Sequence, residues 1–234
     1  MGIRTKIAAV GIAVTAMVGL AAAPASAASS TPTLYPGSKG TAVKTLQKRL
    51  KALHYDPGTV NGKYGQNTEY AVWAFERVNG LTLTKNGKVG AAFWKKLNSP
   101  RSPKVLKPKG GANRVEVNKT TQVATVYVKN TVALISHVST GGGYYYTCSS
   151  GKGRCYAHTP DGDYKIYYKI NGWHRAALGY MYRPLYFRAG GYALHGDSSV
   201  PWYPASHGCV RFPNHTTDIL WTLAGLGTKV YIRG

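Results

Sequence analysis

The hydrophobic pattern of this chain changes its period on either side of one short stretch. Residues 99–111 hold three prolines and four cationic side chains but few apolar ones, which is typical of an extended, solvated linker. Apolar side chains before it recur at helical spacing, whereas Val- and Thr-rich runs after it indicate strands. The sequence therefore predicts two domains. A small all-α three-helix module at residues 31–98 is followed, after a linker at 99–112, by a mostly β, sandwich-like domain with a short helix at 113–234.

The two periods also predict individual elements. Helices are expected at residues 41–50 and 67–78 and, more briefly, around Trp94 and Leu97, where apolar side chains share one helical face. Another helix is expected at residues 216–226. Strands are expected where Val-, Thr- and aromatic-rich runs occur, at residues 114–118, 122–128, 131–139, 164–170, 184–188 and 229–233.

The first residues have the pattern of a secretory signal peptide, Met1–Ala27. Arg4 and Lys6 form a cationic start, residues 7–23 are almost all apolar, and residues 25–27 (Ala-Ser-Ala) are a small-residue cleavage site. A retained membrane anchor is the alternative, because the apolar run is close to spanning length. The helix-breaking proline before the cleavage site favours removal. No second apolar run of that length follows, so we expect a secreted, extracellular or cell-wall-associated protein with no stable membrane insertion after cleavage.

The net charge of the chain limits the kinds of partner that such a protein is expected to bind. The chain has 30 Lys and Arg against 8 Asp and Glu, a formal net charge of +22, spread over both halves and the linker. With 44% hydrophobic and only 16% charged residues, it is not a disordered polyelectrolyte. A basic surface favours polyanions such as nucleic acid, a membrane face or a cell-wall polymer. Export leaves anionic cell-wall polymers as the expected partner and argues against nucleic acid.

Reactive side chains are densest in two segments, residues 192–196 (Tyr-Ala-Leu-His-Gly) and 204–211 (Pro-Ala-Ser-His-Gly-Cys-Val-Arg). Cys209 has His207 two positions before it and Arg211 two positions after it. This segment looks like a strand, so we expect alternation to place all three side chains on one side. Cationic neighbours lower the cost of forming a thiolate, which is the reactive form of a thiol.

His195 and Gly208 complete a candidate site for acyl transfer. His195 can approach the thiol if the intervening proline-containing loop folds back. Gly208 lets backbone N–H groups approach an oxyanion without a Cβ in the way. We therefore expect Cys209 to be a nucleophile that forms a thioester.

Three other interpretations of these residues are weaker. A lone cysteine is often a buried core residue, but this one has His, Gly and Arg as neighbours. His195, His207 and Cys209 could be zinc ligands, yet there is no His-Glu-x-x-His motif, and no Glu follows Glu116 to act as a general base. A glycosidase needs two carboxylates, and only four Asp follow Glu116. We expect neither a metal nor another cofactor.

The three cysteines of an exported chain leave one unpaired. Cys148 and Cys155 lie in a Gly- and Ser-rich segment with six residues between them, and they are candidates for a small disulfide. Cys209 is then the free thiol. Other pairings are open, and a pairing through Cys209 would abolish the catalytic interpretation.

The two reactive segments resemble a known family. His195-Gly196, followed by the run Ser-His-Gly-Cys-Val-Arg at residues 206–211, resembles the signature of the L,D-transpeptidase catalytic domain. Residues 158–164 are similar to that family's Thr-Pro-x-Gly-x-aromatic segment. The resemblance covers residues 114–233, including the closing helix and the last strand.

The resemblance implies a role for each matched residue. Cys209 would be the nucleophile, and His195 would accept and then donate the proton. Ser206 and His207 would orient and polarise the site, while Gly208 and Cys209 would offer backbone N–H groups to the oxyanion. Arg211 would support the nucleophile or bind substrate. The candidate substrate-binding residues are Tyr192, Gly196, Trp202 and Tyr203.

The same resemblance implies a reaction on peptidoglycan. Cys209 would attack the carbonyl of the third residue of a stem tetrapeptide and release the terminal D-Ala. The acyl group would then pass to the amine of a neighbouring stem's third residue, giving a 3→3 cross-link. The alternatives are an L,D-carboxypeptidase, which uses water as acceptor, and a wall-binding protein without catalytic activity.

Residues 41–97 separately resemble the three-helix peptidoglycan-binding module. The matches include Leu46-Gln47 and the turn Asn61-Gly62. Asn61 and Glu76 stand where Asp and Gln are more usual in that module. This resemblance implies that the first domain binds the cell wall.

Overall fold

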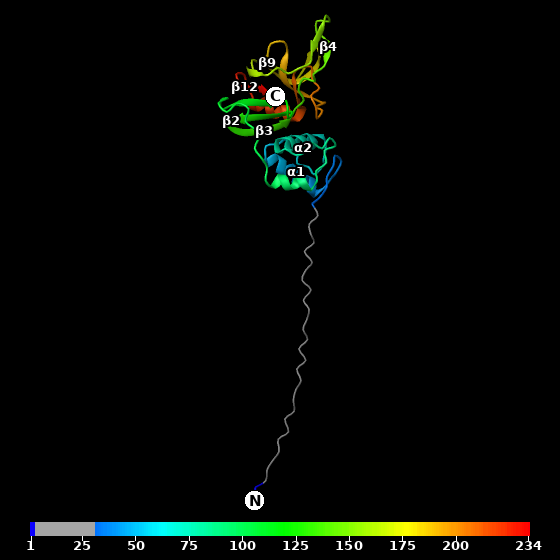
Figure 1. Ribbon diagram of the computed structural model, residues 1–234, viewed down its shortest axis with the longest axis vertical. Coiled ribbons are helices and arrows are strands. Elements are labelled where there is room, and N and C mark those ends of the chain that lie inside the picture. The colour runs from blue at the N-terminus through cyan, green and yellow to red at the C-terminus, as the bar shows by residue number, and fades with distance from the viewer. Residues whose placement is uncertain (3–30) are drawn as a thin grey trace. The chain divides into compact units, whose positions relative to one another are not determined.

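The structure of the chain is a computed structural model that describes residues 1–2 and 31–234 (Figure 1). The predicted signal peptide, residues 1–27, lies outside the described residues except for its first two. Among the residues described, no helix combines the length and the apolar character needed to span a membrane. Residues 31–234 make up one unit.

Three helices form the helical module, residues 31–98, as the helical periodicity predicts. They are α1 (Thr41–Ala52), α2 (Gln66–Asn79) and α3 (Ala91–Asn98). Each helix buries one apolar face against the others. The buried apolar side chains include Val43, Leu46, Leu50, Ala71, Val72, Phe75, Phe93, Trp94 and Leu97.

A buried polar side chain, Gln47, closes the turn between α1 and α2. Its Nε2 donates to Lys63 O and to Thr68 Oγ1, both at 3.0 Å. Its Oε1 accepts from the N–H groups of Asn61 and Gly62 at 3.1 and 2.9 Å. Gly62 has a φ of +74°, a conformation that favours glycine. One glutamine thus supplies the acceptor for the buried N–H of Gly62, whereas the exposed Asn61 also donates to the carbonyl of Thr59 at 3.0 Å.

Two five-stranded sheets make up most of residues 113–234 (Figure 1). The first, in the order β3-β2-β1-β12-β6, consists of β1 (Arg114–Asn118), β2 (Val123–Val128), β3 (Thr131–His137), β6 (Gly162–Lys165) and β12 (Lys229–Arg233). The second, in the order β11-β10-β9-β7 with β8 also paired to β9, consists of β7 (Tyr168–Lys169), β8 (Trp173–Ala176), β9 (Gly179–Arg188), β10 (Tyr192–Asp197) and β11 (Val210–Pro213). A separate hairpin pairs β4 (Tyr145–Thr147) with β5 (Arg154–Tyr156), and α4 (Asn214–Leu223) follows β11.

The two sheets and α4 share one apolar core. It includes Val115, Val117, Ala124, Val126, Leu134, Leu185, Phe187, Leu194, Val210, Phe212, Leu220, Val230 and Ile232. Alternate residues of β1 and β12 contribute to it, because successive side chains of a strand point to opposite faces. The predicted fold class, an α module followed by a mostly β domain with a short helix, is confirmed.

The bounds of the strands differ from the sequence pattern mainly in the middle of the β domain. The predicted strand at 164–170 is two short strands, β6 and β7, which belong to different sheets. The predicted strand at 184–188 is only the end of the longer β9, and the helix predicted at 216–226 is α4. The pattern does not predict β4, β5, β8, β10 or β11, which are rich in Tyr, Gly, His and Arg and poor in Val and Thr.

The helical module packs against the first sheet through α2, which lies beside β3 (Figure 1). Val123 of β2 and Ile135 of β3 belong to the apolar core of the module. Ile135 also forms a parallel bridge with Tyr55, and Thr216 of α4 donates to Asp56 at 3.0 Å. The two predicted domains therefore share an apolar boundary.

Candidate active site

A cavity of about 270 Å³ opens beside the second sheet. Seven of the residues singled out in the sequence line it: Tyr192, His195, Ser206, His207, Gly208, Cys209 and Arg211. The rest of the wall comes from the β4–β5 hairpin, the β8–β9 turn and the ends of β10: Tyr146, Ser149, Ala176, Ala177, Leu178, Gly179, Tyr180, Met181, Gly190, Gly191 and Asp197. The two reactive segments meet because β10 and β11 are neighbouring parallel strands.

Cys209 lies on a bend, not on a strand. Ser206 forms an isolated bridge, residues 207–209 bend, and β11 begins only at Val210. The expected strand at Cys209 is therefore wrong, but His207, Cys209 and Arg211 nevertheless all line the same cavity, as expected. We call residues 206–209 the Cys209 loop.

Gly208 is the residue that allows this bend. Its φ is +149°, a conformation that side chains of L-residues rarely adopt. A Cβ at this position would lie 2.7 Å from the ring of Tyr192 and 2.9 Å from the carbonyl oxygen of His158. Any side chain would force the loop away from both neighbours.

Two buried hydroxyl groups hold the Cys209 loop. Ser206 Oγ donates to the carbonyl of Cys209 at 2.6 Å and accepts from the N–H of Gly208 at 3.0 Å. Thr159 Oγ1 donates to the carbonyl of Gly208 at 2.7 Å and accepts from the N–H of Gly141 at 2.9 Å. The expected role of the Gly208 N–H as an oxyanion donor does not match the structure, because Ser206 already occupies that group. Thr159 lies in the segment at residues 158–164 that resembles the L,D-transpeptidase family. Its contact with the Cys209 loop is not apparent from the sequence.

His195 on β10 is held in one tautomer. Its Nδ1 lies 2.8 Å from the carbonyl oxygen of Gly196, and because a carbonyl only accepts, Nδ1 must carry the hydrogen. The other ring nitrogen, Nε2, is then unprotonated. Burial lowers the pKa of His195, so the ring is neutral near pH 7 and Nε2 can accept a proton.

Cys209 is the free cysteine among the described residues, and its thiol is protonated in the resting site. Burial raises the pKa of Cys209 to about 11, against the opposing effects of the Ala193 backbone and the Arg211 charge. Its Sγ donates to the carbonyl oxygen of Gly191 at 3.4 Å. A thiol of this kind needs a base at the moment of attack, and His195 lines the same cavity.

Arg211 forms an ion pair inside the cavity. It lies opposite His195 in the register of β10 and β11, and its Nε is 3.3 Å from Asp197 Oδ2. Asp197 also accepts from the N–H of Ser199 at 2.9 Å. Asp197 is a wall residue that the sequence does not single out. Within the residues that the structure describes, no three or more His, Cys, Asp or Glu side chains gather where they could hold a metal ion.

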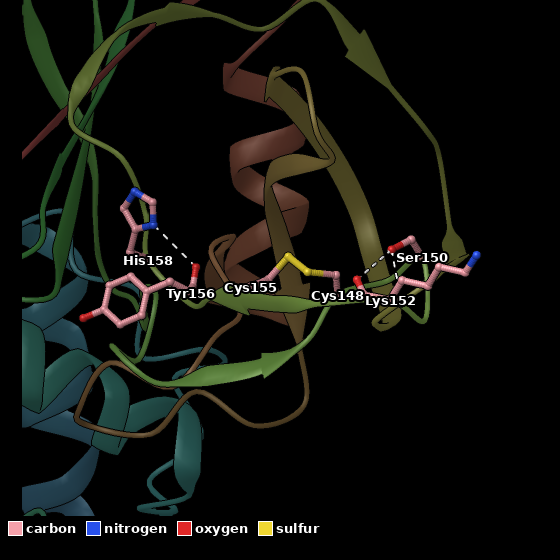
Figure 2. Close-up of a disulfide and its surroundings, with 6 residues drawn as sticks. All are labelled: Cys148, Ser150, Lys152, Cys155, Tyr156 and His158. Carbon is pink, nitrogen blue, oxygen red and sulfur yellow. Dashed lines mark hydrogen bonds between the residues drawn. A yellow bond between two sulfur atoms is a disulfide. The ribbon is translucent and has the colours of Figure 1, made fainter.

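The β4–β5 hairpin forms a second wall of the cavity. Cys148 and Cys155 are joined by a disulfide across it (Figure 2). Tyr146 of β4 lines the cavity, and its ring centroid is 4.5 Å from that of His207 in an edge-on contact. Tyr144 contacts the same imidazole at 5.6 Å. Burial, and then the Arg211 charge, lower the pKa of His207, so this ring serves the site as a neutral contact between the hairpin and the Cys209 loop.

Three predicted substrate-binding residues lie elsewhere. Trp202 and Tyr203 are not part of the cavity wall, so the prediction that they line it is wrong. Trp202 packs instead against the helical module, with Lys85 Nζ 4.7 Å from its ring centroid. Gly196 is also outside the wall and contributes its carbonyl to His195. Aromatic side chains occur both in binding clefts and in apolar cores. For Trp202, packing against the helical module places the side chain in a core.

Comparison with known proteins identifies the family. A family model described as the L,D-transpeptidase catalytic domain matches residues 112–232. The chain belongs to the L,D-transpeptidase family. Residues 39–97 match a second family model, described as a peptidoglycan binding domain. The resemblances stated from the sequence are thereby confirmed.

Solved structures of L,D-transpeptidases are among the proteins that match this chain. One from Xylanimonas cellulosilytica is 38% identical with a TM-score of 0.78, covering 85% of this chain and 97% of that one. Another, from Stackebrandtia nassauensis, is 22% identical with a TM-score of 0.47, covering 88% of this chain and 96% of that one. No curated protein matches the sequence. The family and the site geometry together support a transpeptidase enzyme.

Proposed function

We propose that this protein is an exported cysteine L,D-transpeptidase that forms 3→3 cross-links in peptidoglycan through a thioester on Cys209. One observation carries the proposal. A free thiol and an imidazole with an unprotonated Nε2 line the same cavity, and buried hydroxyl groups hold the loop that bears the thiol. Acyl transfer through a thioester needs this pair.

The first half-reaction acylates the enzyme. The carbonyl of the third residue of a stem tetrapeptide enters the cavity beside Cys209. His195 Nε2 takes the thiol proton as sulfur attacks, and a tetrahedral oxyanion forms. The carbon–nitrogen bond then breaks, the proton passes from His195 to the departing D-Ala amine, and the acyl group stays on sulfur.

The second half-reaction transfers the acyl group to a neighbouring stem. The side-chain amine at that stem's third residue attacks the thioester and gives up a proton to His195. The carbon–sulfur bond breaks and the thiolate recovers that proton, so the enzyme is unchanged over one cycle. If water replaces the amine, the product is a tripeptide and the enzyme is a carboxypeptidase.

The charges around the thiol fit an anionic intermediate. Gly208 already donates its N–H to Ser206. We therefore assign the hydrogen bond to the oxyanion to the N–H of Cys209, together with any donors that come into reach when the substrate binds. Arg211, held by Asp197 at 3.3 Å, adds positive charge that favours the thiolate. Ser206 and Thr159 act as positioning residues.

The helical module supplies attachment to the same polymer. Its match to a peptidoglycan binding domain supports binding of the wall by residues 39–97. The formal charge of +22, of which Arg4 and Lys6 of the signal-like segment carry +2, supports additional, salt-sensitive adhesion of the remaining chain to anionic wall polymers. The signal-like segment at residues 1–27 supports export to that location.

Product analysis tests the proposal. Purified protein is incubated with disaccharide-tetrapeptide, and the products are separated and weighed by mass spectrometry. A cross-linked dimer with loss of one D-Ala supports the transpeptidase, whereas tripeptide alone identifies a carboxypeptidase. An unchanged substrate would leave only the wall-binding role, and the same products from Cys209→Ala would overturn the thioester on Cys209.

A further inference from the structure

The segment between β10 and the Cys209 loop is held by the helical module. This connecting loop, residues 198–205, contains neither helix nor strand. Both of its ends are at the cavity, because Asp197 and Ser206 line the wall. Whatever fixes the connecting loop therefore also constrains the path of the chain from His195 to Cys209.

Arg77 of α2 reaches from the module into the β domain. Its Nη2 donates to the carbonyl oxygen of Trp202 in the connecting loop. Its Nη1 donates to the carbonyl oxygen of Thr121, just before β2, at 3.0 Å. The two ends of one planar guanidinium thus join the connecting loop to the first sheet, a geometry that a lysine ammonium cannot reproduce.

Two aromatic residues of α2 support the same loop. Tyr70 Oη accepts from the N–H of Val200 at 3.4 Å, and Tyr70, Trp73 and Val200 form one buried apolar cluster, on which Trp202 packs. The connecting loop is therefore anchored along its first half by side chains of a single helix.

His137, the last residue of β3, completes this contact. It is almost fully buried, and its Nε2 lies 3.2 Å from the carbonyl oxygen of Val200 and 3.0 Å from that of Pro201. Its ring stacks on Tyr70 at 5.8 Å and meets Trp73 edge-on at 5.3 Å. The imidazole is thus held between α2 on one side and the connecting loop on the other.

The backbone beyond His137 carries this support to the reactive residues. Ser139 pairs with Arg211 through two backbone hydrogen bonds of 2.9 and 3.0 Å. The carbonyl of Thr140 accepts from the N–H groups of Ala205 and Ser206, both at 2.9 Å. The connecting loop, the end of β3 and the Cys209 loop are therefore one continuous hydrogen-bonded layer that rests on α2.

We propose that Arg77 is a positioning residue for Cys209, acting through the connecting loop, and that the helical module is thereby a structural part of the catalytic unit. The inference rests on the proposed role of Cys209 as nucleophile. Removing the guanidinium leaves the carbonyls of Trp202 and Thr121 without this donor and removes the link that α2 makes between the connecting loop and the start of β2, so that the loop is held less firmly. The thiol then samples positions that His195 Nε2 does not reach.

Arg49 offers a matched control for this role. Its guanidinium also donates twice, to Asn98 Oδ1 at 2.7 Å and to the carbonyl of Leu97 at 2.9 Å. Both acceptors belong to the helical module, so Arg49→Met removes a comparable pair of contacts without touching the β domain. Arg77→Met and Arg49→Met are compared with the wild-type full-length mature protein.

The experiment measures reaction and loop order separately. Transpeptidation rates over a range of substrate concentrations, well below the melting temperature of every variant, should show kcat reduced about tenfold in Arg77→Met with KM changed less than twofold. Arg49→Met should keep both within twofold of wild type. Hydrogen exchange followed by mass spectrometry should show faster exchange at residues 198–209 in Arg77→Met only.

Equal kinetics in the two variants, or unchanged exchange at residues 198–209 in Arg77→Met, would overturn the proposal. If Arg77→Met does not fold, Tyr70→Phe removes the hydroxyl group that accepts from Val200, and the same local increase in exchange is required of it. If the wild-type protein forms no product at all, the proposed function fails. The exchange comparison then still decides whether Arg77 orders the connecting loop.

Discussion

Two buried networks of uncharged side chains, one in each half of the molecule, hold a glycine-containing loop by its backbone. In the helical module, Gln47 binds the N–H groups of Asn61 and Gly62. In the β domain, Ser206 and its partners bind the backbone of the Cys209 loop. Gln47 and Ser206 are equally buried, each 1% exposed. The loop around Gly62 carries no reactive group, whereas the Cys209 loop carries the thiol that lines the cavity.

The same kind of buried hydrogen-bond network therefore has two roles, stability in the helical module and positioning of the thiol in the β domain. A buried hydrogen bond contributes little net stability, but an unpaired buried group costs about 1–3 kcal/mol. In the helical module that cost falls on folding alone. In the β domain it falls also on the position of the Cys209 sulfur, where a shift of about 1 Å is expensive for catalysis. Substitutions in the two networks should therefore separate stability from rate.

Ser206→Ala should have the largest effect, on rate. It removes the donor to the Cys209 carbonyl and leaves the Gly208 N–H unpaired, a loss of about 3 kcal/mol, or roughly 100-fold in the acylation rate. The rate is measured by intact-mass spectrometry at a temperature where the variant is folded. A normal acylation rate together with a lowered melting temperature would show that Ser206, like Gln47, contributes to stability alone. The proposed difference between the two networks would then be wrong.

Glu76→Gln should change the pH dependence of stability in the helical module. Burial raises the pKa of Glu76 to about 7 in the folded state, although two hydrogen bonds from Thr84 oppose the shift. Because the folded state then holds this proton more tightly than the unfolded chain, the contribution of Glu76 to stability should be fully present below about pH 4.5. This contribution should fall by about 3 kcal/mol as pH rises through 7 and then level off.

Glutamine does not titrate, so the variant should lack this slope. Unfolding in urea at pH 4.5, 6 and 8 measures it. Parallel pH profiles for the wild-type protein and the variant would show that Glu76 is not the titrating group. Acylation of Cys209 at a fixed pH should stay within twofold in the variant, since Glu76 is not part of the cavity wall.

Gln47→Ala should lower stability by about 2 kcal/mol, because it removes the acceptor of the buried Gly62 N–H. The acylation rate well below the melting temperature should remain within twofold of wild type. Urea unfolding and intact-mass kinetics on the same preparation give both quantities. A rate loss as large as that of Ser206→Ala would show that the module's own loop reaches the active site.

The sequence predicts the structural parts of the molecule better than the parts that form the site. The three helices and the strands β1 and β12 are predicted because their buried apolar residues keep one period, and nothing functional interrupts it. β10 and β11 are missed because site residues, His195 and Arg211 among them, take positions that apolar residues would otherwise hold. Local pattern therefore fails where the chain is used for chemistry.

The site shows the same limit. The motif around Cys209 and His195 predicts which residues meet, and the structure brings both to one cavity. It does not predict that the Thr159 hydroxyl holds the Gly208 carbonyl, because this contact joins residues 49 positions apart and its acceptor is a backbone group, which every residue type has. Nor does it predict that Trp202 packs on α2, since that depends on how the two halves meet.

Loss of the disulfide should affect the rate far less than Ser206→Ala, although both changes are at the cavity. Cys148→Ser with Cys155→Ser frees the β4–β5 hairpin, whose Tyr146 forms a wall of the cavity. A ring of this size contributes roughly 2–3 kcal/mol to local order on the loop-entropy model. Because the hairpin holds the cavity wall and not the thiol, the acylation rate should fall only about threefold. A loss near 100-fold would place the hairpin on a par with the Cys209 loop.

The most direct test of the central claim is the mass of the protein during turnover. Wild-type enzyme mixed with disaccharide-tetrapeptide and quenched in acid should carry an adduct equal to the substrate minus D-Ala. Proteolysis should locate this adduct on the peptide that contains Cys209. A carbapenem should acylate the same residue, as the family resemblance implies, and Cys209→Ala should remain unmodified with both reagents. Product formation without any adduct, or an adduct that persists in Cys209→Ala, would contradict the account.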